Sequence, residues 1–226
     1  MYSHTGRLAI GIDTSGYGEL VCVLVARDAE ALRLFVSRVE KRLAAEGYRG
    51  DLHWRRIRTA TRKKVLQDIA GYLKEARSRG VVAYIFRCKR REGVDKRFFF
   101  LRLLPMRISD RLIDDVRGMG SGRVCVTSDR DFDSLVPDVG DATSEFLDRL
   151  LSNLASRIAC AEVRPKAGRE LVANVVVPGA QVTIVGVKRR HDYHIELKAA
   201  DVVLGLYNDS LKRGRRLDGV ILETVG

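Results

Sequence analysis

Short apolar runs of strand length alternate with long amphipathic segments along this chain, and this alternation constrains the fold more than any other feature. Val81–Phe86 is a continuous apolar run, typical of a strand that is covered on both faces. Helical periodicity, with apolar residues three and four positions apart, runs from Asp28 to Leu43 and from Thr61 to Arg79. Strands interspersed with long helices predict an α/β fold in which helices flank a mixed sheet.

The first two strands are expected to form a hairpin, because the glycine-containing turn Thr14–Gly18 separates two apolar runs. Asp28 stands at the expected N-cap of the first helix, and Pro105 is expected to kink or break a helix. The predicted strands are Arg7–Asp13, Glu19–Arg27, Leu52–Ile57, Val81–Phe86, Arg123–Thr127, Val172–Val177 and Gln181–Val187. The predicted helices are Asp28–Leu43, Thr61–Arg79, Arg97–Gly118, Ala142–Ala161 and Glu196–Lys212.

At 226 residues, and with no repeat or linker in the sequence, the chain is expected to form one domain over residues 1–226 with helical insertions. The longest apolar run, Val21–Ala26, is far shorter than the roughly 20 residues that span a bilayer. The four cysteines form no Cys-x-x-Cys pair, which argues against a zinc ribbon. We therefore expect a cytoplasmic protein without a membrane partner, and a homodimer is left open.

Positive charge is the strongest compositional signal. The 41 Lys and Arg residues against 29 Asp and Glu give a formal net charge of +12. A basic protein of this kind often meets a polyanion, and nucleic acid is the commonest one. The alternative is that these cations only cover solvent-facing helices.

Three carboxylates stand where an apolar element ends or is interrupted. Asp13 closes the first predicted strand, and Asp129 follows the strand Arg123–Thr127. Ligands of open α/β sheets usually bind at such strand ends. Asp13 could instead shape an Asx-type turn near Ser15, and Asp129 could belong to a solvated acidic loop that also contains Asp131.

Asp201 is the third and the most telling of these acids. It interrupts a segment, Ala199–Tyr207, that is otherwise apolar almost all round. A lone buried carboxylate is costly, so Asp201 should face a counter-charge. A metal ion, an arginine partner, or an N-cap position in a later-starting helix would each meet that need.

Together, Asp13, Asp129 and Asp201 have the oxygen ligands that Mg²⁺ or Mn²⁺ prefers. In two-metal phosphodiester hydrolysis, such carboxylates hold ions that activate water and stabilise the leaving oxygen. The basic side chains that could hold phosphate beside them are Arg55, Arg56, Lys188, Arg189, Arg190 and Lys198.

Four short motifs occur in order along the chain. They are Gly-Ile-Asp-Thr-Ser-Gly at Asp13, Asp-Leu-His-Trp at His53, Val-Thr-Ser-Asp at Asp129, and Leu-Lys-Ala-Ala-Asp-Val-Val at Asp201. This order resembles a widespread, poorly characterised prokaryotic family of ribonuclease H-like fold, which opens with Asp-Glu-Ser-Gly and closes with Gln-x-Ala-Asp. The resemblance implies acidic site positions at Asp13, Asp129 and Asp201, and it matches His53 to a histidine that is frequent in the family.

The chain departs from the family pattern at three positions, one of which is Asp51, a shorter acid in the neighbourhood of a family glutamate. Thr14 replaces a glutamate of the opening motif, which removes one candidate ligand, and Lys198 stands near the place of the glutamine. Asp131, His53 and Ser15 remain further candidates for the site. His53 and Trp54, beside Arg55 and Arg56, could stack on bases, or Trp54 could belong to the core.

The leading hypothesis is a metal-dependent nuclease-like hydrolase acting on DNA or RNA. The second is a nucleic-acid-binding protein of the same fold without turnover, which the loss of an acid at Thr14 motivates. A third is a phosphatase that uses Asp13, although the common aspartyl-phosphate pattern would need a second acid at Ser15.

Overall fold

A computed structural model describes residues 6–15, 18–89, 93–119, 122–159, 171–177, 182–188 and 194–226. Its strands are β1 (Gly6–Thr14), β2 (Leu20–Ala26), β3 (Val81–Cys88), β4 (Gly122–Ser128), β5 (Leu171–Val177), β6 (Val182–Lys188) and β7 (Val220–Val225). Its helices are α1 (Ala29–Ala45), α2 (Thr59–Ser78), α3 (Lys96–Phe98), α4 (Leu104–Arg117), α5 (Asp131–Leu135), α6 (Ala142–Ala159) and α7 (Ile195–Leu211). The 3-10 turn η1 (Trp54–Arg56) precedes α2, and the π turn η2 (Phe99–Leu103) joins α3 to α4.

The described strands form one mixed sheet in the order β5-β6-β4-β1-β2-β3-β7. Strands β1, β2 and β3 make an antiparallel meander, whereas β4 lies parallel to β1 and β6 lies parallel to β4. β5 pairs antiparallel with β6, and β7 runs parallel to β3. The sequence-based expectation of a mixed sheet flanked by helices is therefore confirmed.

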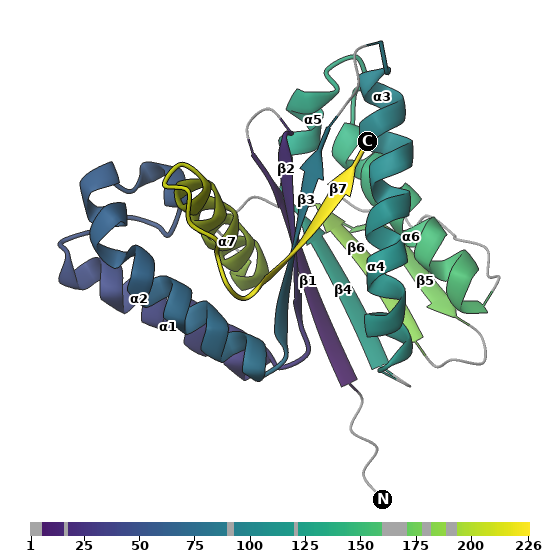
Figure 1. The fold of residues 1–226 in the computed structure, drawn as a ribbon. Helices are drawn as coiled ribbons and strands as arrows, with labels where there is room; N and C mark the ends of the chain where they lie inside the picture. Colours follow the sequence, from purple (N-terminus) through teal and green to yellow (C-terminus); the bar gives the residue numbers. More distant parts are fainter. Residues whose placement is uncertain are drawn as a thin grey trace, which may run out of the picture.

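Helices cover both faces of the sheet, with α4 and α6 on one side and α1, α2 and α7 on the other (Figure 1). Side chains alternate between the two faces of a strand. In β1, Leu8, Ile10 and Ile12 are fully buried in the core beneath α4 and α6. Ala9 packs into the second core, beneath α1, α2 and α7. Asp13 lies an even number of residues from Ala9, so its side chain is on the α7 face.

Local sequence explains where several elements begin and turn. Asp28 caps α1 by accepting hydrogen bonds from the backbone N–H groups of Glu30 and Ala31, as expected. Pro105, in contrast, does not break its helix. It lies in the first turn of α4, where the missing N–H costs little, and the wider π turn η2 precedes it.

Two sequence-based expectations about elements are wrong. The predicted strand Leu52–Ile57 contains the 3-10 turn η1 instead, and Trp54 is only 1% exposed, so it is a core residue and not a base-stacking platform. Strand β7 was not expected from the sequence, yet it extends the sheet beside β3. None of the described helices combines the length and the apolarity needed to cross a membrane.

Candidate active site

Two carboxylates lie side by side where the adjacent parallel strands β1 and β4 reach their carboxyl ends. Asp13 is the penultimate residue of β1, and Asp129 directly follows β4. In their register Ile12 faces Ser128, and the backbone N–H of Asp129 donates to the carbonyl oxygen of Ile12 at 3.3 Å. Asp13 and Asp129 follow these paired residues directly. The structure thus brings together two acids that are far apart in the sequence.

Helix α7 can approach these strand ends closely because two glycines remove side chains from its path. A Cβ atom on Gly11 in β1 would lie 2.3 Å from the carbonyl oxygen of Glu196 in α7. A Cβ atom on Gly205 would lie 2.0 Å from the indole ring of Trp54. The helix therefore packs directly against the backbone of β1 at one point and against η1 at another.

This packing places Asp201 at the centre of a hydrogen-bonded contact between α7 and η1. Its Oδ2 atom accepts a hydrogen bond from the backbone N–H of Trp54 at 2.6 Å and lies 3.1 Å from Nδ1 of His53. The hydrogen bond to Asp201 raises the pKa of His53 above its ordinary value. Because α7 begins at Ile195, Asp201 is not an N-cap, and one of its partners is the imidazole of His53.

The charge environment of Asp13 shows that the acids act on one another. Asp13 is buried, with 5% of its surface exposed. Burial raises the pKa of Asp13 well above its ordinary value, and the negative charges of Asp201, Asp131 and Asp129 raise it further, in that order of importance. The positive charge of Arg55 acts in the opposite direction. Arg55 therefore faces a group of four carboxyls.

The thiol of Cys22, on the neighbouring strand β2, is also affected by the negative charges of Asp13 and Asp201. Cys22 is the register partner of Asp13 across the β1–β2 hairpin. Burial raises the pKa of Cys22 most, followed by the charges of Asp13 and Asp201. The two carboxylates are therefore close enough to influence a common neighbour.

Asp131 and Asp129 complete the acidic group from the β4 side. The hydroxyl of Thr14 donates to Oδ2 of Asp131 at 3.0 Å, so Thr14 holds this acid in place. Burial raises the pKa of Asp129, while the backbone N–H of Arg130, 2.6 Å from Oδ1, opposes that shift. Arg55 reaches the site through its guanidinium, which lies 3.4 Å from the carbonyl oxygen of Thr14.

The donor chemistry of this group suits a hard divalent cation, since all four acids offer carboxylate oxygens. Their present positions do not amount to a formed metal site. In the part of the chain that the structure describes, no three His, Cys, Asp or Glu side chains are arranged so that they could hold a metal ion. Asp201 also has its Oδ2 atom engaged by Trp54 and His53. Binding an ion would require these side chains to move.

The other candidates from the sequence fall in different places. Ser15 closes the β1–β2 hairpin, because its side-chain oxygen accepts a hydrogen bond from the N–H of Leu20. Lys188 is largely buried between Asp133 and Asp141, with which it forms ion pairs.

The remaining basic candidates divide into paired and exposed residues. Lys198 pairs with Glu40 at 3.6 Å, while Arg55 and Arg56 are exposed beside the acids. Arg189 and Arg190 lie outside the described residues. Among the candidate cations that the structure describes, Arg55 and Arg56 therefore have free access to a ligand beside the acids.

Two further buried acids of α7 were not among the expected site residues. Asp209 accepts a hydrogen bond from the indole N–H of Trp54 at 3.1 Å and pairs with Arg62. Glu196 accepts a hydrogen bond from Thr127 at 2.8 Å. Both lie in the apolar last helix, where an isolated acid was the signal that singled out Asp201. The same signal could have found them.

Comparison of this chain with protein-family models, with curated proteins and with solved structures found no match. What the site does is therefore argued from its own geometry and charge.

Proposed function

We propose that this protein is a metal-dependent phosphodiester hydrolase that acts on nucleic acid. The observation that carries the proposal is the carboxyl of Asp13, whose pKa is raised by burial and then by the charges of three neighbouring acids, which lie in α7, at the start of α5 and directly after β4. A fold keeps such mutually repelling carboxylates together at a cost in stability. Perturbed acids of this kind cluster at functional sites.

The fold that we propose is ribonuclease H-like. Support comes from the antiparallel β1–β2–β3 meander, from the acids at the carboxyl ends of β1 and β4, and from the acid in the last helix. The complete sheet order differs from a ribonuclease H-like sheet, with β7 added beside β3. The fold name therefore rests on the arrangement of the site strands and not on the whole sheet.

In this proposal Asp13, Asp129 and Asp201 are the residues that would hold Mg²⁺ or Mn²⁺. The ion would supply an activated water and charge stabilisation at the leaving oxygen. The chain itself orients the acids: the backbone N–H of Trp54 positions Asp201, and Thr14 positions Asp131. The exposed guanidinium of Arg55, next to Asp13, is placed to bind a phosphate oxygen.

A second candidate function is nucleic-acid binding without turnover. The specific observation in its favour is that Oδ2 of Asp201 is already bonded to Trp54 and His53, and that no three ligating side chains are gathered among the described residues. In that case the acids would shape the surface, and the exposed arginines beside them would hold the phosphates.

Cleavage assays on end-labelled single-stranded, double-stranded and hybrid oligonucleotides, with Mg²⁺, Mn²⁺ or EDTA, separate the two candidates. We expect metal-dependent cleavage by the wild type and a loss of at least about 100-fold in Asp13→Asn and Asp201→Asn, since ligand removal abolishes the metal's contribution. In Asp201→Asn, the amide keeps an oxygen that can accept the hydrogen bond from the backbone N–H of Trp54, so we expect this variant to fold. Asp114→Asn, an exposed acid on α4, is the matched control.

Thermal unfolding of each variant establishes that it is folded before its activity is compared. Wild-type protein that binds all three substrates but cuts none of them supports the second function. Cleavage that continues unchanged in folded Asp13→Asn shows that the proposed active site is wrong.

A further inference from the structure

One exposed face of α2 carries cations and no acid. Lys63, Gln67, Ala70, Lys74 and Arg77 follow one another at spacings of four, three, four and three residues, which places them in one row along a helix. The three basic side chains in the row are exposed. A straight basic row therefore runs along almost the full length of α2.

The acids of α2 lie on a different side and are neutralised by α1. Asp68 accepts a hydrogen bond from Arg42 at 2.6 Å, and Glu75 pairs with Arg38. These acids of α2 therefore pair with arginines of α1, and they do not neutralise the basic row of α2. No ion pair with a described residue involves Lys63, Lys74 or Arg77.

The connection between α7 and β7 adds further positive charge along the same side of α2. It is anchored at one end by the pair between Arg62 and Asp209, 3.3 Å apart. At the other end, Gly219 lies against Leu73. In Figure 1 this connection is the yellow segment that descends from α7 to the base of β7.

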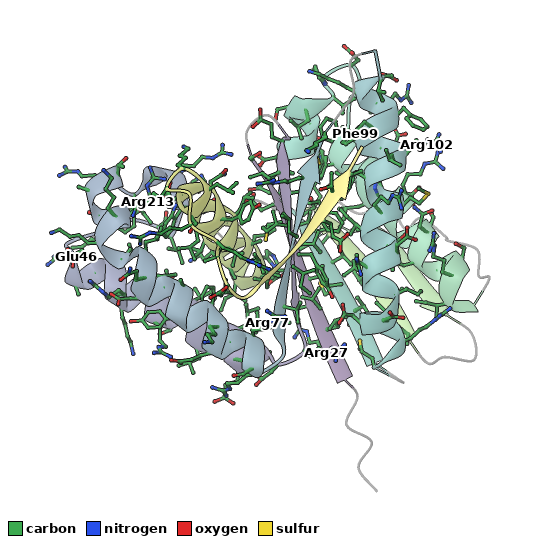
Figure 2. The ribbon with its side chains drawn as sticks, in the orientation of Figure 1. Arg27, Glu46, Arg77, Phe99, Arg102 and Arg213 are labelled. Atoms are coloured by element: carbon green, nitrogen blue, oxygen red, sulfur yellow. The ribbon has the colours of Figure 1, made fainter. Side chains whose placement is uncertain are left out.

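Three arginines of this connection, Arg213, Arg215 and Arg216, likewise form no ion pair within the described residues. Figure 2 shows Arg213 near the C-terminal end of α7, and Arg77 lower down, toward the base of β7. Lys74, Arg77 and Arg216 line a surface hollow of about 560 Å³, in which Asp218 is the acid. The basic row and the connection therefore form one surface.

We infer that these six residues form a binding surface for the phosphate backbone of nucleic acid, continuous with the active site. We call this surface, made by Lys63, Lys74, Arg77, Arg213, Arg215 and Arg216, the basic ridge. At the active-site end it continues into Arg55, Arg56 and Arg58, which are exposed and immediately precede α2. The inference rests on the proposed function for the identity of its ligand.

The dimensions of the ridge define the kind of substrate. Lys63 and Arg77 are 14 residues apart, so at 1.5 Å per residue the row is about 21 Å long. A duplex has one phosphate per strand for each 3.4 Å of its axis, so the row matches about six consecutive phosphates. The substrate is therefore a strand or duplex that extends at least about six nucleotides to one side of the cleavage point, and not a dinucleotide.

The test compares two triple variants that each remove three positive charges. One is Lys63→Gln, Lys74→Gln, Arg77→Gln. The control is Arg33→Gln, Arg102→Gln, Arg107→Gln, which changes exposed residues of α1, η2 and α4 outside the ridge. Fluorescence anisotropy gives the Kd for labelled 20-base-pair duplex, 20-nucleotide and 4-nucleotide strands across a salt series in EDTA.

Loss of three phosphate contacts should lower the slope of log affinity against log salt by about 2 to 3 for the duplex. The control triple should change this slope by much less, and the 4-nucleotide strand should lose little affinity in either variant. Equal slopes in the ridge variant and the wild type overturn the inference. The inference is also overturned if the ridge variant loses binding to anionic phospholipid vesicles while it keeps its nucleic-acid affinity.

Binding and cleavage are measured separately so that the two proposals fail separately. If folded Asp13→Asn still cuts nucleic acid while the ridge variant loses its salt slope, the proposed active site is wrong and the ridge stands. If Asp13→Asn loses cleavage while the ridge variant binds as the wild type does, the active site stands and the ridge is wrong.

Discussion

Two buried carboxylates on opposite faces of the sheet have contrasting surroundings. On the α4 face, Asp115 accepts hydrogen bonds from the guanidinium of Arg27 at 2.7 Å and from the hydroxyl of Tyr84 at 3.0 Å. On the α7 face, Asp13 is surrounded by three other acids, with Arg55 as the opposing charge. Both are 5% exposed, so burial alone does not distinguish them.

The difference indicates that Asp115 stabilises the fold and that Asp13 destabilises it. Asp115 exchanges its hydration for a cation and a hydroxyl, so its burial is compensated. Asp13 instead faces like charges, and burial further disfavours its ionised form. The structure is organised to satisfy Asp115 and to hold Asp13 in an unfavourable state that a ligand could relieve.

Replacing Asp115 with Asn should give the largest effect in this comparison. Asn cannot neutralise Arg27, so hydrogen bonds to a charged acceptor are lost, and we expect the free energy of unfolding to fall by about 2 kcal/mol. Urea denaturation measures the change. Asp114→Asn, the exposed neighbour on the same helix, should change stability by less than about 0.5 kcal/mol. Equal effects in the two variants would show that Asp115 is not a stabilising partner.

Tyr84→Phe should have a smaller effect that depends on pH. Loss of the hydrogen bond to Asp115 should cost about 1.5 kcal/mol at neutral pH. Burial and the charge of Asp115 raise the pKa of Tyr84 from its ordinary value of 10 to about 12. The folded protein therefore keeps the phenol proton after the unfolded chain begins to lose it, and the hydroxyl's contribution, complete below pH 10, is lost as the pH rises through about 12.

The measurement is the difference in unfolding free energy between wild type and Tyr84→Phe as a function of pH. This difference should shrink between pH 10 and 12. A difference that stays constant across this range would contradict the raised pKa.

Asp13→Asn should have the smallest effect and the opposite sign. Removal of a buried charge that faces three acids should raise the free energy of unfolding at pH 7, on the order of 1 kcal/mol. Because the pKa of Asp13 is raised in the folded state, the wild type should recover this deficit as the pH falls through the raised pKa toward 3.8, the ordinary value.

Thermal unfolding with and without Mg²⁺ sharpens this prediction. Mg²⁺ should raise the Tm of the wild type and not that of Asp13→Asn, since a ligand stabilises only the form that binds it. If Asp13→Asn instead destabilises the protein as Asp115→Asn does, the carboxyl of Asp13 is structural, and the contrast between the two faces is wrong.

Most of the regular elements could be predicted from local patterns. The predicted strands that became β1 to β6 are rich in apolar residues, and the long helices have apolar residues at helical spacing. β7 was missed because its residues Val220–Val225 are only partly buried at an edge, so their pattern is weak. The segment around η1 was mistaken for a strand because Leu52 and Trp54 alternate with polar residues there, yet both are buried in the core around a 3-10 turn.

The sequence could predict which acids belong to the candidate site, but not which residues contact them. Asp13 and Asp129 could be found because each follows an apolar strand, and Asp201 because it is an acid in an apolar helix. The hydrogen bond between Trp54 and Asp201 joins residues 147 positions apart, and no local pattern encodes it. The pairing of Lys188 with Asp133 and Asp141, which removes a predicted phosphate ligand, is likewise a tertiary contact.

The sequence by itself determined that this is an α/β protein of high positive charge with carboxylates at strand ends, because periodicity and composition act locally. Only the tertiary structure decided which acids are satisfied and which repel one another, since that depends on how α4 and α7 pack on the two faces of the sheet. The same is true of the cations: α1 neutralises the acids of α2 and so leaves the basic ridge exposed. Charge is set by the chain, and compensation of charge is set by the fold.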